Sequence, residues 1–463
     1  MGNLSSVHPY IPNSVEEVQK EMLKDIGVNS IDDLYEDIPQ ELRFKGEMNL
    51  PEACESEFEL RKHVEGILAK NISTSESISF LGGGSYKHFV PSVVDEVINR
   101  SEFLTAYAGE PYEDHGRFQA LFEYESLMGE LLDCDVVNVP TYDWGQAAST
   151  ACRMAGRLAE RDEILVCEAI SPDRMLVIKN YCEPVMKVKT VKVDQATGEI
   201  DLEDLKSKIT EKTAGVYFEN PNYFGVIESN GQEISDIMHN AGAEVVVGVD
   251  PVSLGILTPP MQYGADIVCG DIQGLGNHMG FGGTLAGFIG TRDEERYVME
   301  FPSRLFGIAK TEKEGEWGFD DVAYDRTSFG VREKGKEFIG TAAALYGIAT
   351  AVHLSLMGPE GMKDVGQLCL QKSLYLKKKL QTVNGVAIKH SSASFKEFVV
   401  DFSGCKKSLS EINKALLAEG IFGGKELTGD FDELKNCALF CVTETIGQKE
   451  IDKLIEVLTR ILN

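Results

Sequence analysis

The chain has 463 residues, of which 43% are hydrophobic, so it is long enough for one large domain with smaller additions. Its formal net charge of -29 comes from 74 acidic and 45 basic residues and argues against nucleic acid or an anionic membrane as partners, because both would be repelled. The ten cysteines contain no CxxC pair, which indicates reduced thiols in a cytoplasmic protein and no metal site. Neither a signal peptide nor a long uncharged apolar run is evident.

The N-terminal segment, residues 1–70, is expected to form a helical arm. Ser14 with Glu17 has the spacing of a capping box, the side-chain arrangement that opens a helix. Ser30 with Asp33 has the same spacing and predicts a second short helix.

A large domain is expected over residues 71–335, because short β-branched runs alternate there with helix-length segments. Continuous apolar strands separated by helices are typical of a mostly parallel sheet that is covered on both faces. The sequence therefore predicts an α/β fold of the doubly wound kind, with strands at 136–140, 163–168, 214–220, 244–250, 265–271 and 285–290.

The pattern changes after residue 335, and residues 336–463 are expected to form a small α+β domain. A long Ala/Leu-rich helix at 340–358 is followed by a further helix and then by strands near 395–403 and 438–444. Ser408 and Glu411 form another capping box, and Gly420 is the expected stop of that helix. The last helix carries one apolar stripe, made of Ile451, Leu454, Ile455 and Leu458.

Ligands of open α/β sheets bind beyond the carboxyl ends of the strands, so the residues just past each strand are candidates for a pocket. Gly145 opens a small-residue helix whose free N–H groups suit a phosphate, although tight helix packing explains the glycine equally well. Asp250 ends a buried apolar strand and therefore needs a partner, unless it merely caps a helix. The whole candidate pocket comprises Thr141, Tyr142, Gly145, Asn220, Asp250, Gln273 and His278.

The order of these features is the layout of fold-type I pyridoxal-phosphate enzymes, in which an aspartate holds the pyridine nitrogen and a later lysine binds the cofactor covalently. The lysine is expected within "GDIQGLGNHMG", residues 270–280, and is absent there. No lysine occurs between Asp250 and Lys310. The chain is therefore not expected to perform Schiff-base chemistry alone.

Several longer stretches carry a family resemblance. They are "MLKDIGVNSIDDLYEDIP" in the arm, "FLGGGSYKHFVP", "FEYESLMGELL", "ENPNYFGVIE", "DPVSLGILTPPMQYGADIVCGD" and "MGFGGTLAGF". With them the chain resembles the P-protein family of the glycine cleavage system, glycine dehydrogenase (decarboxylating), over almost its whole length. Within that family it is similar to the first subunit of the two-chain form.

The resemblance implies a degenerate subunit with the fold of aspartate aminotransferase-like enzymes. In that form pyridoxal phosphate and its lysine belong to the second subunit, so no cofactor bound covalently by this chain and no catalytic residue in it are expected. The implied partners are that catalytic subunit in an α2β2 assembly, glycine as substrate, and the lipoyl carrier H-protein, which receives the aminomethyl group as carbon dioxide leaves.

Three segments depart from the pattern that the resemblance leads us to expect: "AGEPYEDHG", "YDWGQA" and "RTSFGVREKGKEFIG". They leave two alternatives open. One is a divergent paralogue whose partner acts on another amino acid or amine. The other is a stand-alone binding protein or pyridoxal-phosphate protein that uses another lysine, such as Lys310 or Lys313.

Two stretches near the entrance of the large domain are candidates for contact with the partner's site. "FLGGGSYKHFVP" has three consecutive glycines, which permit close backbone approach, and "LTAYAGEPYEDHG" is dense in hydrogen-bonding groups. Tyr107 and Tyr112, with His88 or His115, are the expected contacts. The alternative is a loop that only packs against the partner.

Overall fold

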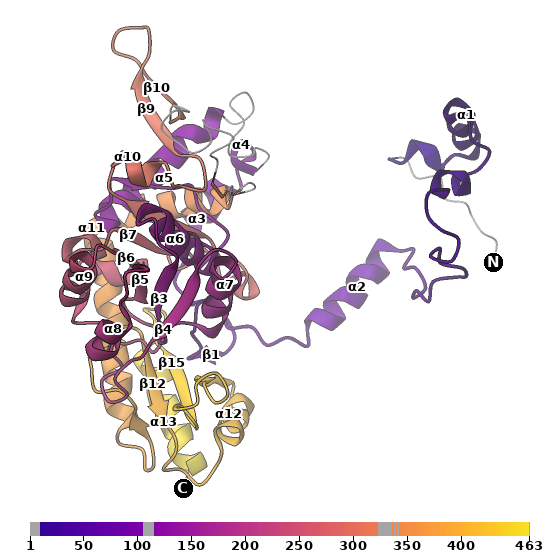
Figure 1. Cartoon of the computed structure of the whole chain (residues 1–463). Helices are drawn as coiled ribbons and strands as arrows, with labels where there is room; N and C mark the ends of the chain where they lie inside the picture. Colours follow the sequence, from indigo (N-terminus) through magenta and orange to yellow (C-terminus); the bar gives the residue numbers. More distant parts are fainter. Residues whose placement is uncertain (1–9, 105–114, 323–335, 338, 340–341, 463) are drawn as a thin grey trace. The chain divides into compact units, whose positions relative to one another are not determined.

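The computed structural model describes residues 10–104, 115–322, 336–337, 339 and 342–462 (Figure 1). The chain divides into two compact units, residues 1–72 and 73–463. No helix within the described residues is long and apolar enough to cross a membrane. All ten cysteines are unpaired.

The first unit is a series of short helices: η1 (Pro12–Ser14), α1 (Glu16–Ile26), η2 (Ile31–Tyr35) and α2 (Glu57–Leu68). The capping box of Ser30 and Asp33 is confirmed at the start of η2. The one expected from Ser14 and Glu17 is wrong, because α1 begins at Glu16 and Val15 occupies the N-cap position without a side-chain bond. None of the described residues 10–72 is buried, so this unit has no core of its own.

The second unit contains a seven-stranded sheet in the order β2-β8-β7-β6-β5-β3-β4. The central strands are parallel, and β8 runs antiparallel to both of its neighbours. All six predicted strands belong to it, and a seventh, β4, was not predicted. The strands are β2 (Val136–Val137), β3 (Glu163–Cys167), β4 (Lys187–Val191), β5 (Thr213–Glu219), β6 (Glu244–Val249), β7 (Ile267–Asp271) and β8 (Gly287–Thr291).

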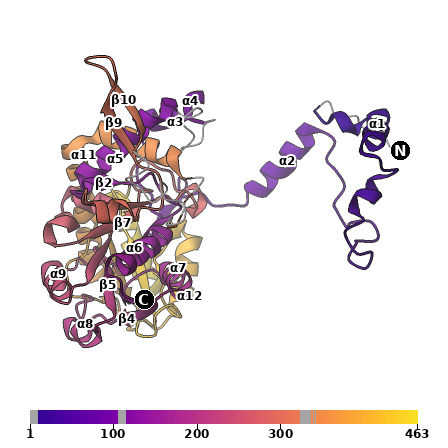
Figure 2. The same cartoon turned by 45° about the horizontal axis from the view of Figure 1, so that its top comes forward.

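Helices cover both faces of this sheet, as Figures 1 and 2 show. Along β6, Val245, Val247 and Val249 enter the core on one face and Val246 enters the core on the other, which is the period of two expected for a strand. The first face packs against α5 (His115–Leu132), α8 (Leu202–Lys208), α9 (Gly231–Asn240) and α11 (Ala344–Leu380). The second packs against α6 (Trp144–Leu158), α7 (Pro172–Cys182) and α10 (Glu295–Val298).

A hairpin of β9 (Phe306–Lys310) and β10 (Trp317–Asp321) extends from the same unit (Figure 1). It was not predicted, because its strands carry glycines and charges instead of an apolar run. Short elements complete this part of the chain: α3 (Ser92–Ile98), α4 (Ser101–Leu104), η3 (Pro251–Gly255), η4 (Pro260–Tyr263) and η5 (Gly280–Gly282).

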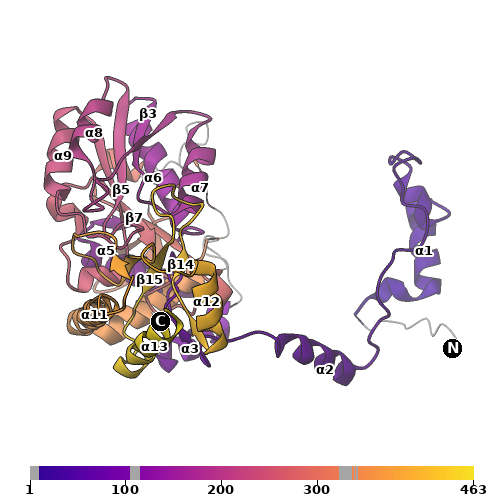
Figure 3. The same ribbon diagram turned by 90° about the horizontal axis from the view of Figure 1, so that it is seen from below.

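The C-terminal part forms a four-stranded antiparallel sheet in the order β11-β12-β15-β14 (Figure 3). The expected long helix and its successor are the two parts of α11, which change direction at Gly358 before Pro359. Ser408 and Glu411 form the predicted capping box, and Gly420 has a φ of 73° just past the helix end. The elements are β1 (Ile78–Ser79), which pairs with β13 (Ile421–Phe422), β11 (Ala387–Ile388), β12 (Glu397–Asp401), α12 (Leu409–Ala418), β14 (Lys425–Glu426), β15 (Cys437–Cys441) and α13 (Gln448–Leu462).

Candidate functional site

Asp250 lies at the carboxyl end of β6, where the fold places its ligand site, and it is paired with a lysine of the C-terminal part of the chain. The Lys396 ammonium, just before β12, lies 2.7 Å from Oδ2 of Asp250, and the two side chains are only 2% and 11% exposed. The ammonium also lies 3.5 Å from the ring centroid of Tyr86, a cation–π contact. Burial by itself would lower the pKa of Lys396, but the Asp250 carboxylate raises it above its ordinary value. The partner that Asp250 was expected to need is therefore an internal cation.

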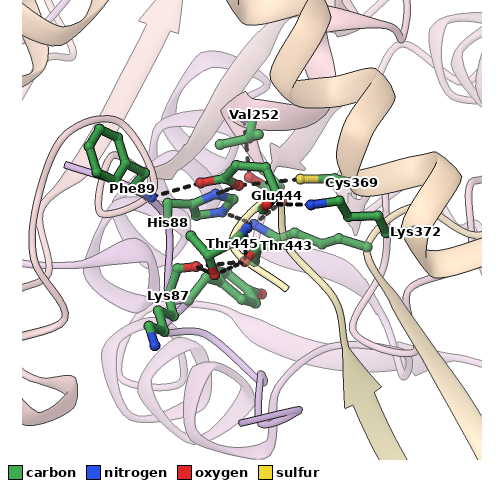
Figure 4. A network of polar contacts seen from close by, with 12 residues as sticks. Lys87, His88, Phe89, Val252, Cys369, Lys372, Thr443, Glu444 and Thr445 are labelled. Atoms are coloured by element: carbon green, nitrogen blue, oxygen red, sulfur yellow. Dashed lines mark hydrogen bonds and ion pairs between the residues drawn. The ribbon is translucent and has the colours of Figure 1, made fainter. Parts of the chain in front are cut away.

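A second line of contacts continues from this ion pair to His88 and Glu444. Figure 4 shows His88 and Glu444 with their neighbours Phe89 and Cys369. Lys396 Nζ lies 3.0 Å from Nε2 of His88, and Nδ1 of His88 lies 2.7 Å from Oε2 of Glu444. An ammonium group only donates, so Nε2 accepts and Nδ1 carries the proton that His88 donates to Glu444. Burial alone would raise the pKa of Glu444, but the bonds from His88 and from the Phe89 N–H hold it at about 2.

Cys369 joins this network, and with His88 and Glu444 it is the only described group of three such side chains whose ligand atoms lie within 4.8 Å of one another. The donor set of nitrogen, sulfur and oxygen would suit zinc. A metal on Nδ1 of His88, however, would displace its proton while Nε2 still has to accept from the Lys396 ammonium. The cluster therefore fits a hydrogen-bonded junction better than a metal site.

The three-glycine motif brings the chain across this region. A Cβ on Gly82 would lie 2.2 Å from Oε1 of Glu397, so only glycine fits there. Gly83 has a φ of 84° and donates its N–H to Glu397 at 2.7 Å. The Tyr86 hydroxyl donates to the other oxygen of Glu397 at 2.8 Å. The close backbone approach that these glycines permit is therefore to Glu397 within this chain.

Gln273 follows β7 and holds the backbone of the same segment. Its Oε1 accepts from Tyr86 N at 2.8 Å, and its Nε2 donates to Tyr86 O at 3.0 Å. Gln273 N in turn donates to Asp271 at 2.8 Å, and burial raises the pKa of Asp271 to about 7 despite two backbone hydrogen bonds. A neutral amide thus lies in the stretch where the aldimine lysine was expected.

The start of α6 had two explanations, free N–H groups for a phosphate or tight helix packing, and the structure places a carboxylate there. Asp143 is the N-cap residue, and its Oδ1 accepts from Gln146 N at 2.7 Å. A phosphate at the same point would meet this negative charge. A Cβ on Gly145 would lie 3.4 Å from Cβ of Val177 in α7, so the packing explanation of this glycine has a structural basis.

Large side chains fill the space between α6 and Asp250. The guanidinium of Arg174 lies 4.1 Å from the ring centroid of Trp144 and binds both oxygens of Glu219, at 2.7 and 2.9 Å. The indole N–H of Trp144 donates to Tyr217, whose hydroxyl donates to Glu219. The remaining cavity has a volume of about 20 Å³, and Trp144, Arg174, Glu219 and the Asp250–Lys396 pair are among its lining residues. That is room for one water molecule, since a single water needs at least ~10–15 Å³.

Other predicted site residues lie apart from this cluster. Asn220 bonds to Glu228 and Tyr263, Tyr142 is half exposed, and Thr141 is buried next to Gly287. His278 is exposed and pairs with Asp95 at 3.0 Å.

The candidate contacts to a partner divide into two groups. Tyr107 and Tyr112 lie outside the described residues, and of His115 only its place at the start of α5 is described. His88 is 3% exposed, with both ring nitrogens engaged.

The two alternative lysines belong to the β9–β10 hairpin. Lys310 is exposed and lies over the ring of Trp317, and Lys313 pairs with Glu316. Neither joins the Asp250 cluster.

The sheet order and the aspartate at the end of β6 define the fold of fold-type I pyridoxal-phosphate enzymes. A NifS-like protein from Rickettsia africae shares this fold, with a TM-score of 0.61 at 15% identity over 83% of this chain and 99% of that one. The family model "Glycine cleavage system P-protein" matches residues 8–458, so the chain belongs to the glycine cleavage system P-protein family.

Two further relatives agree with this assignment. A "probable glycine dehydrogenase (decarboxylating) subunit 1" of Thermococcus onnurineus is 40% identical over 456 residues, which is 98% of this chain and 99% of that protein. The crystal structure of a glycine decarboxylase (P-protein) in inhibitor-bound form matches with a TM-score of 0.84 at 32% identity, over 99% of this chain and 100% of that one.

Proposed function

We propose that this chain is the first subunit of a two-chain glycine dehydrogenase (decarboxylating), and that it completes the active site of a second subunit that holds pyridoxal phosphate. Membership of the P-protein family and the printed name of the Thermococcus relative support this role. The observation that carries the division of labour is the buried pair of Asp250 and Lys396.

The residues of this chain do not fit pyridoxal phosphate. The cofactor works as an electron sink and needs a lysine, a carboxylate at the pyridine nitrogen and a phosphate site. Here Lys396 already binds Asp250, Asp143 occupies the helix start, and residues 270–280 contain no lysine. The cavity of about 20 Å³ is far below the roughly 300 Å³ at which small-molecule pockets begin.

We propose that this subunit contributes residues that form part of the wall of the partner's active site. Enzymes of this fold build their sites at dimer interfaces, so a subunit without cofactor retains value as the second half of the interface. Tyr107, Tyr112 and His115 remain our candidates for lining the channel through which glycine and the lipoyl arm of H-protein arrive. His88 is omitted, because both of its nitrogens are engaged within this chain.

The first unit is the part proposed to hold the partner subunit. Its apolar side chains have no core to enter and are exposed: Ile26 at 57%, Leu42 at 73%, Phe44 at 72% and Phe58 at 76%. Large apolar side chains exposed in this number are typical of segments that contact another protein. We expect the arm to bury it in the complex, which we propose to be an α2β2 assembly.

The test compares the single chain with the reconstituted complex. Both are incubated with equimolar pyridoxal phosphate, reduced with borohydride and mapped by mass spectrometry. We expect a stoichiometric adduct on one lysine of the second subunit and none on this chain. A stoichiometric adduct on any one lysine of the isolated chain would refute the proposal.

Substrate identity is tested separately, by release of labelled carbon dioxide in the presence of H-protein. We expect release from carboxyl-labelled glycine with both chains present and with neither chain alone. Release from another amino acid in place of glycine would identify the divergent paralogue instead.

A further inference from the structure

The connection between β7 and β8 contains a tight turn that presents one aromatic side chain to solvent. The short helix η5 lies in this turn, and Phe281 is its central residue. Phe281 is the most exposed large apolar side chain among the described residues, with an exposed fraction of 105% against 66% for Phe89 of the same unit. A single exposed apolar side chain is common on protein surfaces and needs no explanation by itself. The backbone of Phe281, however, is unusual as well.

Phe281 has a φ of 59° and a ψ of 26°, which lie in the left-handed region. A bulky side chain is rare in this conformation, because its Cβ crowds the following carbonyl oxygen. The ring is fully exposed, so no burial within this chain compensates the conformational cost. Backbone strain that is kept in this way is typical of functional positions.

The turn around Phe281 is closed by its own backbone. Gly282 N donates to Met279 O at 2.8 Å, and Gly283 N donates to Gly280 O at 3.1 Å. A Cβ on Gly280 would lie 1.8 Å from Oγ1 of Thr284, so only glycine fits there. The chain therefore holds the aromatic residue outwards on a defined turn.

The turn belongs to the edge of the sheet at which the Asp250 cluster lies. The parallel strands β6 and β7 end at this edge, β6 just before Asp250 and β7 at Asp271. His278, which precedes the turn, pairs with Asp95 of α3 at 3.0 Å and ties the connection to that helix. Enzymes of this fold place their ligand sites at this edge and build them at dimer interfaces. Under the proposed function, this edge therefore faces the second subunit.

We propose that Phe281 is an anchor residue for the second subunit, and that its ring enters an apolar pocket of that subunit when the two chains assemble. This inference rests on the proposed function. Aromatic side chains that become buried in a partner's pocket supply much of the binding energy of protein interfaces. Because the turn is already formed in the free chain, its backbone loses little freedom on binding.

The test measures the affinity of the full chain for the purified second subunit of the same organism, by calorimetric titration. We expect Phe281→Ser to weaken association at least ten-fold, because the ring is lost. Phe281→Leu retains an apolar side chain and should lose less affinity than Phe281→Ser.

A third variant, Phe281→Gly, separates the interface from the fold. Glycine adopts the left-handed conformation without strain, so the isolated variant should unfold at no lower temperature than the wild type. Its association with the second subunit should still weaken at least ten-fold. The matched control is Leu417→Ser, which removes an exposed apolar side chain of α12 and should associate as the wild type does.

The outcomes distinguish this inference from the proposed function. If the wild-type chain and the second subunit formed no complex, both would be overturned. If they formed a complex whose affinity Phe281→Ser left unchanged, or which Leu417→Ser weakened equally, the anchor role alone would be overturned. A lower unfolding temperature of isolated Phe281→Gly would show that the ring packs within this chain. Sedimentation of the isolated chain tests the other occupant, since a homodimer that Phe281→Ser dissociates would assign the ring to a second copy instead.

Discussion

Removal of the Lys396 ammonium should destabilise this chain severely, because it would leave the Asp250 carboxylate buried without its cation. The two groups lie 2.7 Å apart, and the side chains are 2% and 11% exposed. Asp250 would keep only the N–H of Val252, at 3.2 Å, as a protein donor in this cluster. Breaking a buried pair by removing one partner costs about 3–5 kcal/mol. Lys396→Met retains most of the stem volume, so the loss of charge dominates.

A double-mutant cycle separates the ion pair from other effects of the substitutions. Lys396→Met, Asp250→Asn and the double variant are unfolded in urea at pH 7, with circular dichroism as the signal. We expect each single variant to lose about 3–5 kcal/mol. The double variant should lose about 2–3 kcal/mol less than the sum of the two, because it leaves no unpaired buried charge.

The matched control is Lys449→Met, since Lys449 is exposed on α13. It should stay within about 0.5 kcal/mol of the wild type. If Lys396→Met also did so, or if the two single losses simply added, the pair would not be the contact that joins β6 to the β12 region. The interpretation of Asp250 as a filled cofactor position would then lose its main support.

Three other perturbations have defined outcomes. Burial raises the pKa of Asp271 to about 7, so its contribution to stability is present below pH 4 and is lost as the pH rises through 7. Asp271→Asn should therefore gain roughly 4 kcal/mol relative to wild type between pH 4 and pH 8 in urea unfolding, and a constant difference would contradict this. The pKa of Glu444 is held at about 2, so Glu444→Gln should cost about 3 kcal/mol at pH 7 and progressively less between pH 4 and pH 2; a loss independent of pH would argue against the His88 contact. Deletion of residues 1–45 should leave the second unit folded but abolish co-purification with the partner subunit. Retained co-purification would show that the arm is not the main contact between the two subunits.

The strands of the large sheet could be predicted wherever they are buried on both faces. In β6 every residue from Glu244 to Val249 is buried. The sequence there is an almost continuous apolar run, which predicts a strand without any knowledge of the neighbouring strands. β4 has the sequence KVKTV and lies at the sheet edge, where only Val191 is buried. An edge strand with alternating lysines has too weak an apolar signal to be separated from a loop.

The chemistry of the candidate site was predictable in kind but not in detail. The cost of burying a charge predicts that Asp250 has a partner. It cannot identify Lys396, which lies far along the chain, just before β12 of the other sheet. The available signal was "FKEFVVDF", where a lysine and a glutamate interrupt an apolar run, and both Lys396 and Glu397 prove to be buried in contact with this site. The only signal in the sequence for the N-cap of α6 was one polar residue, Asp143, directly before the helix.

Introduction of the missing lysine alone should not restore cofactor binding. Each group that would hold pyridoxal phosphate has another partner here: Lys396 neutralises Asp250, and Asp143 caps α6. With a lysine in place of Gln273, the cavity beside Asp250 would still measure only about 20 Å³, and a carboxylate would still cap the start of α6. We therefore expect Gln273→Lys, mixed with equimolar pyridoxal phosphate, to show no aldimine absorbance. If this single substitution did produce an internal aldimine, the cofactor position would be open and only the nucleophile would be missing.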